Sequence, residues 1–250
     1  GRPSVLKGDI VHVTWLSKLF KGRVVQTRLL EVVLDFHKSF TEKFNAKVNR
    51  VDVHFTFSRM AYRIMHEGCS LAETSMKEIM LLPTENTKDD ILTDSVPRSV
   101  ASVRFANRDL NEEQRDAVQK IVQGELRPLP YIIYGPPGTG KTTATVEAIY
   151  QLAKHPDCLR ILAVTPSNAA ADILVERLAQ YFPPSAFEMR RILAYSRSLD
   201  DLPSAVKPYA SDDRTSEGQK LEALTAQIVV STVNLAARFS RWGIPKGHFD

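Results

Sequence analysis

In two stretches of the first sixty residues, apolar and polar side chains alternate with a period of two. This alternation predicts β strands with one buried face and one face turned to water. The stretch 24–36, which follows Gly22 and Arg23, has room for one bent strand or two. Residues 59–82 have a mixed pattern that is compatible with a helix. Several short strands in succession predict a small all-β barrel or open sheet over residues 1–82. The alternating apolar positions are Val11, Val13, Trp15, Val51, Val53, Phe55 and Phe57.

From Leu110 onwards, helical and strand patterns alternate. Asn111 is in N-cap position with Gln114 three residues later, which predicts a capping box and a helix that stops at Gly124. The alternation predicts an α/β fold, a parallel sheet with helices on both faces, over residues 104–250. The polar stretch 83–103 is interpreted as a linker. Further predictions are strands at 131–134, 161–165 and 228–232, helices at 142–154 and 169–181, and a surface insertion at 196–220.

The predicted strand at 131–134 runs into the sequence GPPGTGKT, which has the G-x-x-x-x-G-K-T spacing of a phosphate-binding loop. Its glycines allow the backbone N–H groups to approach and cradle a phosphate at the start of a helix. Lys141 is predicted to reach the β- and γ-phosphates of ATP, and the Thr142 hydroxyl to be a ligand of Mg²⁺. These two are the catalytic candidates. The predicted nucleotide-binding residues are Gln114, Gly135, Pro136, Pro137, Gly138, Thr139, Gly140, Lys141, Thr142 and Thr143.

Composition is that of an ordinary globular protein, with 43% hydrophobic and 25% charged residues in a chain of 250. The two cysteines, Cys69 and Cys158, form no C-x-x-C motif, which favours a reducing, cytoplasmic location. No apolar run reaches the roughly 18 residues of a membrane span, and no signal peptide is recognised. The six histidines lack the spacing of metal ligands.

Charge is unevenly distributed along the chain. Residues 1–63 hold 12 Lys and Arg against 5 Asp and Glu, a net charge of +7, whereas residues 64–250 hold 21 against 24, a net charge of −3. A basic N-terminal region indicates an anionic partner, of which nucleic acid is the commonest. A solvated basic surface without a partner explains the charge equally well.

The GPPGTGKT sequence is typical of two groups, the AAA+ ATPases and the superfamily 1 helicases. The segment LNEEQ, which ends at Gln114, resembles the helicase Q motif, in which a Gln amide reads adenine. The capping box alone would account for Gln114 equally well. The segment 164–172, VTPSNAAAD, resembles helicase motif Ia, which touches the nucleic-acid backbone. An ordinary strand–turn–helix would look the same.

The order of these motifs, together with RILAYSR at 191–197 and the strand at 228–232, resembles the RNA helicase of nonsense-mediated decay and its relatives. Within that group the chain looks most like the Armitage and Moloney-leukaemia-virus-ten-type RNA helicases of small-RNA silencing. The runs KGRV at 21–24 and VHFTFSR at 53–59 are similar to the accessory barrel of these proteins, domain 1B. The resemblance implies domain 1B at 1–82, a linker, and a RecA-like domain 1 at 104–250.

The resemblance also implies a function. The parent protein would hydrolyse ATP, move 5′ to 3′ along single-stranded RNA, and act with silencing or decay factors. In this family the sequence HFD, here 248–250, leads into the strand that carries the Asp-Glu of motif II. The chain is therefore expected to need that motif and a second RecA-like domain for turnover, and to be inactive alone. The expected RNA contacts are Pro166, Ser167, Asn168, Ser231 and Thr232, with Arg197 and Arg191 as weaker candidates.

Two other functions fit the residues. One is an AAA+ ATPase that remodels proteins, although the apolar strand ending in Asp-Glu that such a domain carries about fifty residues after the loop is not found here. The other is a non-catalytic RNA-binding or docking module built on a nucleotide-binding fold. Backbone contacts to a single strand do not separate RNA from DNA as the substrate.

Overall fold

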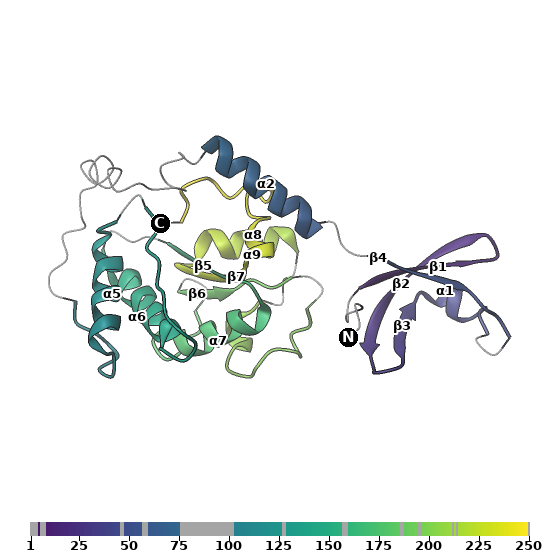
Figure 1. The fold of residues 1–250 in the computed structure, drawn as a ribbon, viewed down its shortest axis with the longest axis horizontal. Helices are drawn as coiled ribbons and strands as arrows, with labels where there is room; N and C mark the ends of the chain where they lie inside the picture. Colours follow the sequence, from purple (N-terminus) through teal and green to yellow (C-terminus); the bar gives the residue numbers. More distant parts are fainter. Residues whose placement is uncertain are drawn as a thin grey trace. The chain divides into compact units, whose positions relative to one another are not determined.

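The computed structural model divides into two compact units, Gly1–Glu67 and Gly68–Asp250 (Figure 1). The predicted linker lies outside the described residues except for Val103, so its structure is not described. The structure describes residues 5, 9–45, 48–56, 60–75, 103–126, 129–156, 160–185, 188–194, 197–211, 213 and 215–249.

The N-terminal unit contains a four-stranded antiparallel sheet with the strand order β3-β2-β1-β4. The alternating pattern predicted β1 and β4 correctly. The stretch 24–36 holds two strands rather than one, because it contains the end of β2 and all of β3. The strands are β1 (Ile10–Trp15), β2 (Lys18–Thr27), β3 (Val32–Phe36) and β4 (Asp52–Thr56).

One face of this sheet forms the core of the unit. Val11, Val13 and Val24 are fully buried there, and the short helix α1 (Lys38–Thr41) adds the buried ring of Phe40. Phe40 lies among other aromatic rings, with centroid separations of 4.7 to 5.9 Å. Aromatic packing of this kind stabilises a small core that has few aliphatic side chains. The surrounding rings are those of Trp15, Phe20, Phe36 and Phe44.

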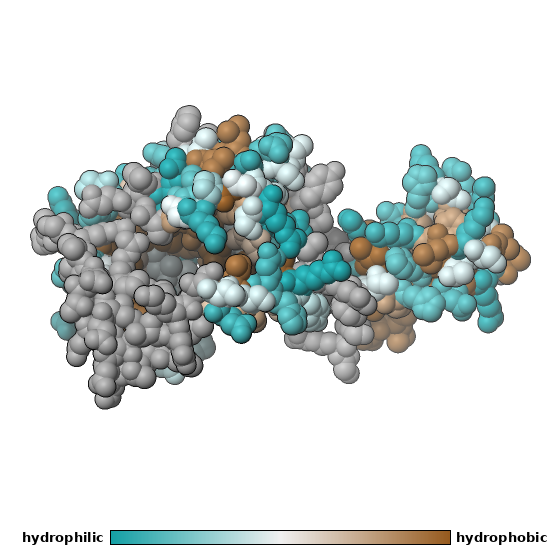
Figure 2. All heavy atoms as spheres, turned by 90° about the horizontal axis from the view of Figure 1, so that it is seen from above, coloured by the Kyte–Doolittle hydropathy of each residue, from teal (hydrophilic) through white to brown (hydrophobic). Residues whose placement is uncertain are grey.

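The prediction that β4 would bury its apolar face was wrong. Val53 and Phe55 pair with Val13 and Val11 of β1, yet they are 37% and 48% exposed. Among the described residues β4 has a neighbouring strand on one side only, and an edge strand is less covered than a central one. Figure 2 accordingly shows hydrophobic residues between hydrophilic ones on the surface of this unit.

Two helices confirm predictions made from local patterns. The mixed stretch 59–82 contains α2 (Met60–Ser75), within which the division between the two units falls. Helix α5 (Glu112–Gln123) begins at the N-cap Asn111 and ends at Gly124, whose φ of +66° is the left-handed conformation that a glycine terminator favours.

The second unit is built on a parallel sheet with the order β5-β7-β6 and has helices on both faces, as predicted. Every second residue of β7 points to the same face. Ile228 and Val230 pack with the side that carries α6 and α7, whereas Val229 packs with the side that carries α8 and α9. The elements are β5 (Ile161–Thr165), β6 (Met189–Arg191), β7 (Ile228–Thr232), α6 (Lys141–Lys154), α7 (Asn168–Leu178), α8 (Ser216–Thr225) and α9 (Val233–Ala236).

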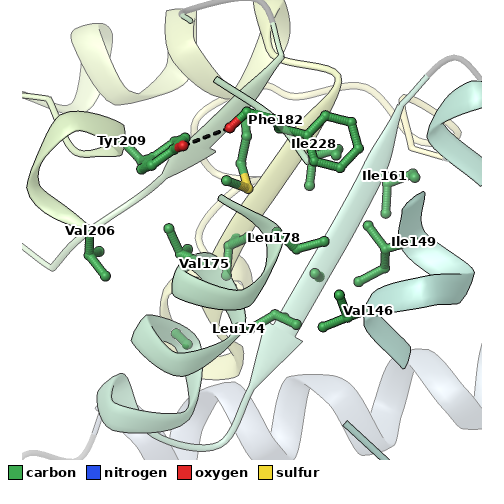
Figure 3. Packing of buried hydrophobic residues seen from close by; sticks show 14 of the residues in the cluster. Val146, Ile149, Ile161, Leu174, Val175, Leu178, Phe182, Val206, Tyr209 and Ile228 are labelled. Atoms are coloured by element: carbon green, nitrogen blue, oxygen red, sulfur yellow. Dashed lines mark hydrogen bonds between the residues drawn. The ribbon is translucent and has the colours of Figure 1, made fainter. Parts of the chain in front are cut away.

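The interpretation of 196–220 as a surface insertion was wrong for its middle part. Val206 is fully buried, and Tyr209, in the 3-10 helix η1 (Lys207–Tyr209), is 3% exposed. Figure 3 shows both side chains in the main core, where the Tyr209 hydroxyl donates a hydrogen bond to the carbonyl of Phe182 at 2.6 Å. Because most residues of this segment are polar or proline, the sequence pattern does not reveal the few apolar side chains that attach it to the core.

The predicted strand at 131–134 is also not observed. These residues form no ladder with a neighbouring strand in the part of the chain that the structure describes, and Ile132 and Tyr134 are 79% and 94% exposed. An apolar run becomes a strand only when another strand pairs with it, and within the described ranges β5, β6 and β7 pair only with one another.

Candidate nucleotide and nucleic-acid sites

The phosphate loop has the backbone conformation that its glycines predict. Gly138 and Gly140 have φ values of +87° and +79°, which L side chains rarely adopt. Gly140 is the N-cap residue of α6, so the free N–H groups at the start of this helix face the loop. This is the arrangement that binds a phosphate through backbone donors and the helix dipole.

The ammonium group of Lys141 is folded over the loop. Its Nζ donates hydrogen bonds to the carbonyl oxygens of Gly135 at 2.6 Å and Pro136 at 2.8 Å. A lysine ammonium has three donors, so one remains after these two bonds. Lys141 is therefore already positioned above the loop, where a phosphate oxygen would be the third acceptor.

Gln114 makes the capping box and also contacts the phosphate loop. Its Oε1 accepts from the backbone N–H of Asn111 at 3.1 Å, and its Nε2 donates to the carbonyl of Thr139 at 3.0 Å. An amide side chain has two acceptor lone pairs and two N–H donors, so each end keeps one position. The two interpretations of Gln114 are thus compatible, because reading adenine needs one acceptor and one donor.

A cavity of about 490 Å³ joins these groups. Gln114 lies on its wall together with Tyr134, Gly135 and Lys141. This volume falls within the range of sites for small molecules and cofactors. Gln114, the candidate for binding adenine, and the candidates for binding phosphate therefore line the same cavity.

Thr142 fits a magnesium ion as one oxygen ligand. It is exposed in the first turn of α6, directly after Lys141. No group of three or more His, Cys, Asp or Glu side chains that could hold a metal is found within the described ranges. Mg²⁺ commonly uses phosphate oxygens and water besides a few protein ligands, so Thr142 would share the ion with the nucleotide.

The expected nucleic-acid contacts lie at the carboxyl ends of two paired strands. Thr165 of β5 is directly beside Thr232 of β7. Pro166, Ser167 and Asn168 follow β5 and are exposed, and the Ser167 hydroxyl caps α7 by accepting from the N–H of Ala170 at 3.2 Å. The capping role was the alternative interpretation of this segment.

Ser231 differs from the other candidates because its side chain is fully buried. Its hydroxyl lies 3.4 Å from the Thr232 carbonyl and is not accessible to a ligand in this structure. We therefore leave Ser231 out of the contacts proposed below.

The two arginines of the 191–197 segment meet at one carboxylate, that of Asp172. Arg191 Nε donates to its Oδ1 at 3.1 Å, and Arg197 donates to both oxygens at 3.0 and 2.5 Å. Arg191 has no exposed side-chain surface, and Arg197 keeps 15%. Burial lowers the pKa of Arg191 from its ordinary value, and the hydrogen bond and charge of Asp172 oppose that shift.

The sequence interpretation missed two buried carboxylates. One is Asp172 and the other is Glu147, which is 1% exposed on α6. Glu147 accepts from the backbone N–H groups of Ala106 at 2.8 Å and Asn107 at 3.0 Å, and so attaches the segment before α5 to the phosphate-loop helix. An acidic residue on the apolar face of a predicted helix was the available signal, since such a residue is buried only with partners.

Two family models match the chain. One is described as an AAA domain and covers residues 109–234, about half of the chain. The chain belongs to the AAA domain family. The match of this AAA domain includes the phosphate loop, motif Ia and β7. The second model, described as the β-barrel domain of helicase MOV-10, covers residues 1–55, which contain the antiparallel strands β1, β2 and β3.

Similar proteins extend the comparison beyond this AAA domain. The putative helicase MOV-10 of Gallus gallus is 34% identical over all of the chain and 26% of its own length. The probable RNA helicase armi of Drosophila melanogaster is 30% identical over 99% of the chain and 24% of its own length. The RNA helicase Mov10l1 of Mus musculus is 37% identical over 66% of the chain and 13% of its own length. The chain thus spans about a quarter of the first two relatives. Within the described residues, no helix is long and apolar enough to cross a membrane.

Proposed function

We propose that this chain binds ATP with Mg²⁺ and single-stranded RNA, as part of an ATP-dependent RNA helicase that moves 5′ to 3′ in RNA silencing or decay. Residues 1–82 would form the accessory domain 1B, residues 83–103 a linker, and residues 104–250 the RecA-like domain 1. Hydrolysis by the whole protein would need a second RecA-like domain. We place the protein in the cytoplasm.

The shared cavity at the phosphate loop carries the nucleotide part of the proposal. Lys141 and the N–H groups at the start of α6 would hold the phosphates, and Thr142 would contribute to the magnesium site. Gln114 would read adenine with the acceptor and donor that its present hydrogen bonds leave free. The magnesium ion would neutralise phosphate charge during transfer.

The strand ends carry the RNA part. Thr165 and Thr232 are neighbours in register, so the exposed loop 166–168 and the end of β7 form one edge of the sheet. One relative that matches nearly the whole chain is named a probable RNA helicase, and another that matches 66% of it is named an RNA helicase, which supports RNA as the substrate. A relative named DNA-binding protein SMUBP-2, from Rattus norvegicus, is 32% identical over 70% of the chain, so single-stranded DNA belongs in every binding test.

Nucleotide binding tests the proposal. We expect Lys141→Ala to weaken ATP binding, measured by calorimetry with Mg²⁺, about tenfold or more, because a charge-assisted hydrogen bond to phosphate is lost. Lys154→Ala, at the other end of α6, is the matched control and should leave affinity unchanged. RNA affinity should not change in either variant, since Lys141 does not lie on the 165–168 loop.

Two outcomes would contradict the proposal. Equal ATP affinity of the Lys141→Ala variant and the unsubstituted chain would remove the phosphate-binding role. Absence of measurable ATP binding with or without Mg²⁺, in a chain that still binds RNA, would favour a non-catalytic RNA-binding module instead.

A further inference from the structure

Asn168 is the first residue of α7 and is exposed, directly after the turn that connects β5 to α7. Its Oδ1 accepts a hydrogen bond from Nη2 of Arg191 at 3.0 Å. The two ends of an Asn side chain are not equivalent, because the oxygen only accepts and the nitrogen only donates. A guanidinium has donors alone, so the Asn168 oxygen has to face Arg191 and the Asn168 nitrogen has to face away.

The guanidinium of Arg191 is itself held on three sides. Besides its bonds to Asp172 and Asn168, its Nη1 donates to the backbone carbonyl of Ile192 at 2.7 Å. Arg191 is the last residue of β6, where it pairs with Val230, whose side chain lies in the core with α7. A planar group with no exposed surface and two fixed acceptors besides Asn168, the Asp172 carboxylate and the Ile192 carbonyl, has one available orientation. It therefore determines the orientation of the Asn168 amide.

We infer that Arg191 is a positioning residue for nucleic acid: it fixes Asn168 so that the Asn168 Nδ2 group donates a hydrogen bond to a phosphodiester oxygen. The inference rests on the proposed RNA-binding function and deepens it. A phosphodiester oxygen accepts hydrogen bonds and donates none, so the nitrogen is the end of Asn168 that the backbone of RNA requires. In the part of the chain that the structure describes, Nδ2 makes no hydrogen bond with a protein group.

Arg191 consequently has a different role from the direct contact considered from the sequence. Its side chain has no exposed surface and cannot reach a ligand. Arg197, the outer arginine, shares the Asp172 carboxylate from the more exposed side, so two guanidinium groups and one carboxylate give this cluster a net charge of +1. Asp172, Arg191 and Asn168 thus form a chain of contacts from the core to the exposed loop.

A double-mutant cycle on the full 250-residue chain tests this inference, with a short oligouridylate as the probe. Arg191→Lys keeps the charge but loses the planar fork that reaches Asn168. We expect Arg191→Lys and Asn168→Ala each to weaken RNA affinity about tenfold or more, the value of one lost hydrogen bond to a charged group. The double variant should bind as Asn168→Ala does, because Arg191 acts through Asn168.

Arg190→Lys is the matched control. It is the same substitution one position earlier on β6, where the side chain lies on the opposite face of the sheet and pairs with Glu222 at 3.7 Å. We expect no change of RNA affinity. An equal loss for Arg191→Lys in both the unsubstituted and the Asn168→Ala backgrounds would show a merely structural role and would overturn the inference. Unchanged affinity of Arg191→Lys would overturn it as well.

A spectroscopic measurement covers the case in which Arg191→Lys does not fold. The side-chain amide signal of Asn168 in a ¹⁵N–¹H spectrum is assigned by its loss in Asn168→Ala. This signal should shift when oligouridylate is added to the unsubstituted chain, and an unchanged signal at saturating RNA would overturn the inference. If the unsubstituted chain bound neither RNA nor single-stranded DNA, the proposed function itself would fail, which is a different result.

Discussion

The donors and acceptors that are already used within the protein determine what each residue around the nucleotide cavity can offer to a ligand. Gln114 uses one acceptor position for Asn111 and one donor for Thr139, so this side chain connects the start of α5 to the phosphate loop. Lys141 uses two donors within the same loop. The empty hydrogen-bonding positions of these two side chains, rather than their presence in a motif, determine what they can offer to a nucleotide.

Gln114→Glu separates the two roles of Gln114. A glutamate at this position keeps the acceptor of the capping box but has no N–H donor for adenine. We expect a modest loss of thermal stability, because the hydrogen bond from Nε2 to the Thr139 carbonyl is also lost, and a fall of about tenfold in the preference for ATP over GTP, as one discriminating hydrogen bond is lost. Competition binding with both nucleotides measures the ratio. A retained preference would mean that Gln114 acts only as the capping residue.

Gly140→Ala tests the conformation of the phosphate loop. A φ of +79° costs an L residue about 1 to 2 kcal/mol, and the added Cβ would lie 2.4 Å from Nε2 of Gln114. We expect a lower unfolding temperature and weaker ATP binding. Gly68→Ala is the control, because a Cβ there meets nothing within 4 Å, and in a helix it should stabilise by about 0.5 to 1 kcal/mol. Equal behaviour of the two variants would contradict the loop conformation.

Pairs of elements are connected by buried polar groups. Helix α6 is attached to the segment before α5 by Glu147, and α7 is attached to β6 by Asp172 and Arg191. Buried charges of this kind contribute orientation more clearly than net stability. In this domain they hold the helices whose first turns carry Lys141 and Asn168.

Glu147→Gln should loosen the connection between α6 and the segment before α5. The amide keeps one acceptor, but its N–H₂ group would face a backbone donor at Ala106 or Asn107. We expect a loss of about 2 kcal/mol in the free energy of unfolding, measured by urea denaturation. Glu176→Gln, an exposed position on α7, is the control and should change stability by less than about 0.5 kcal/mol. A similar small effect for both would show that the backbone bonds of Glu147 contribute little.

At the scale of the whole molecule, the charge distribution and the family matches divide the chain into the same two parts. The match to a β-barrel domain falls in the basic region, and the match to an AAA domain falls in the slightly acidic one. The antiparallel pairing places Lys21 opposite His12, with Arg23 two residues further on the same face of the sheet. This exposed face, opposite the aromatic core, is the part of the basic region suited to phosphate contacts.

A salt titration tests whether that face binds RNA. Replacing Lys21 and Arg23 by Gln should weaken binding of a homopolymeric single strand and reduce the slope of log K against log salt by roughly 1.4, at about 0.7 per phosphate contact. Lys38 and Lys43, on or beside α1 across the aromatic core, form the control pair. Deleting residues 1–82 should flatten the slope by at least as much. Equal slopes for all of these proteins would indicate that the N-terminal unit is a spacer or a protein-docking surface and does not bind RNA.

The sequence by itself determined the elements whose signals are local. The bounds of β5 and β7 follow from short apolar runs, the cap at Asn111 from a side chain that bonds to its own helix end, and the stop at Gly124 from a glycine that takes the left-handed conformation. Tertiary structure alone decided which residues are covered. Among the described residues the 131–134 segment has no strand partner, Phe55 is exposed at a sheet edge, Tyr209 is buried, and Arg191 is an internal contact rather than a surface one. Burial and pairing depend on neighbours distant in the chain, which no local pattern records.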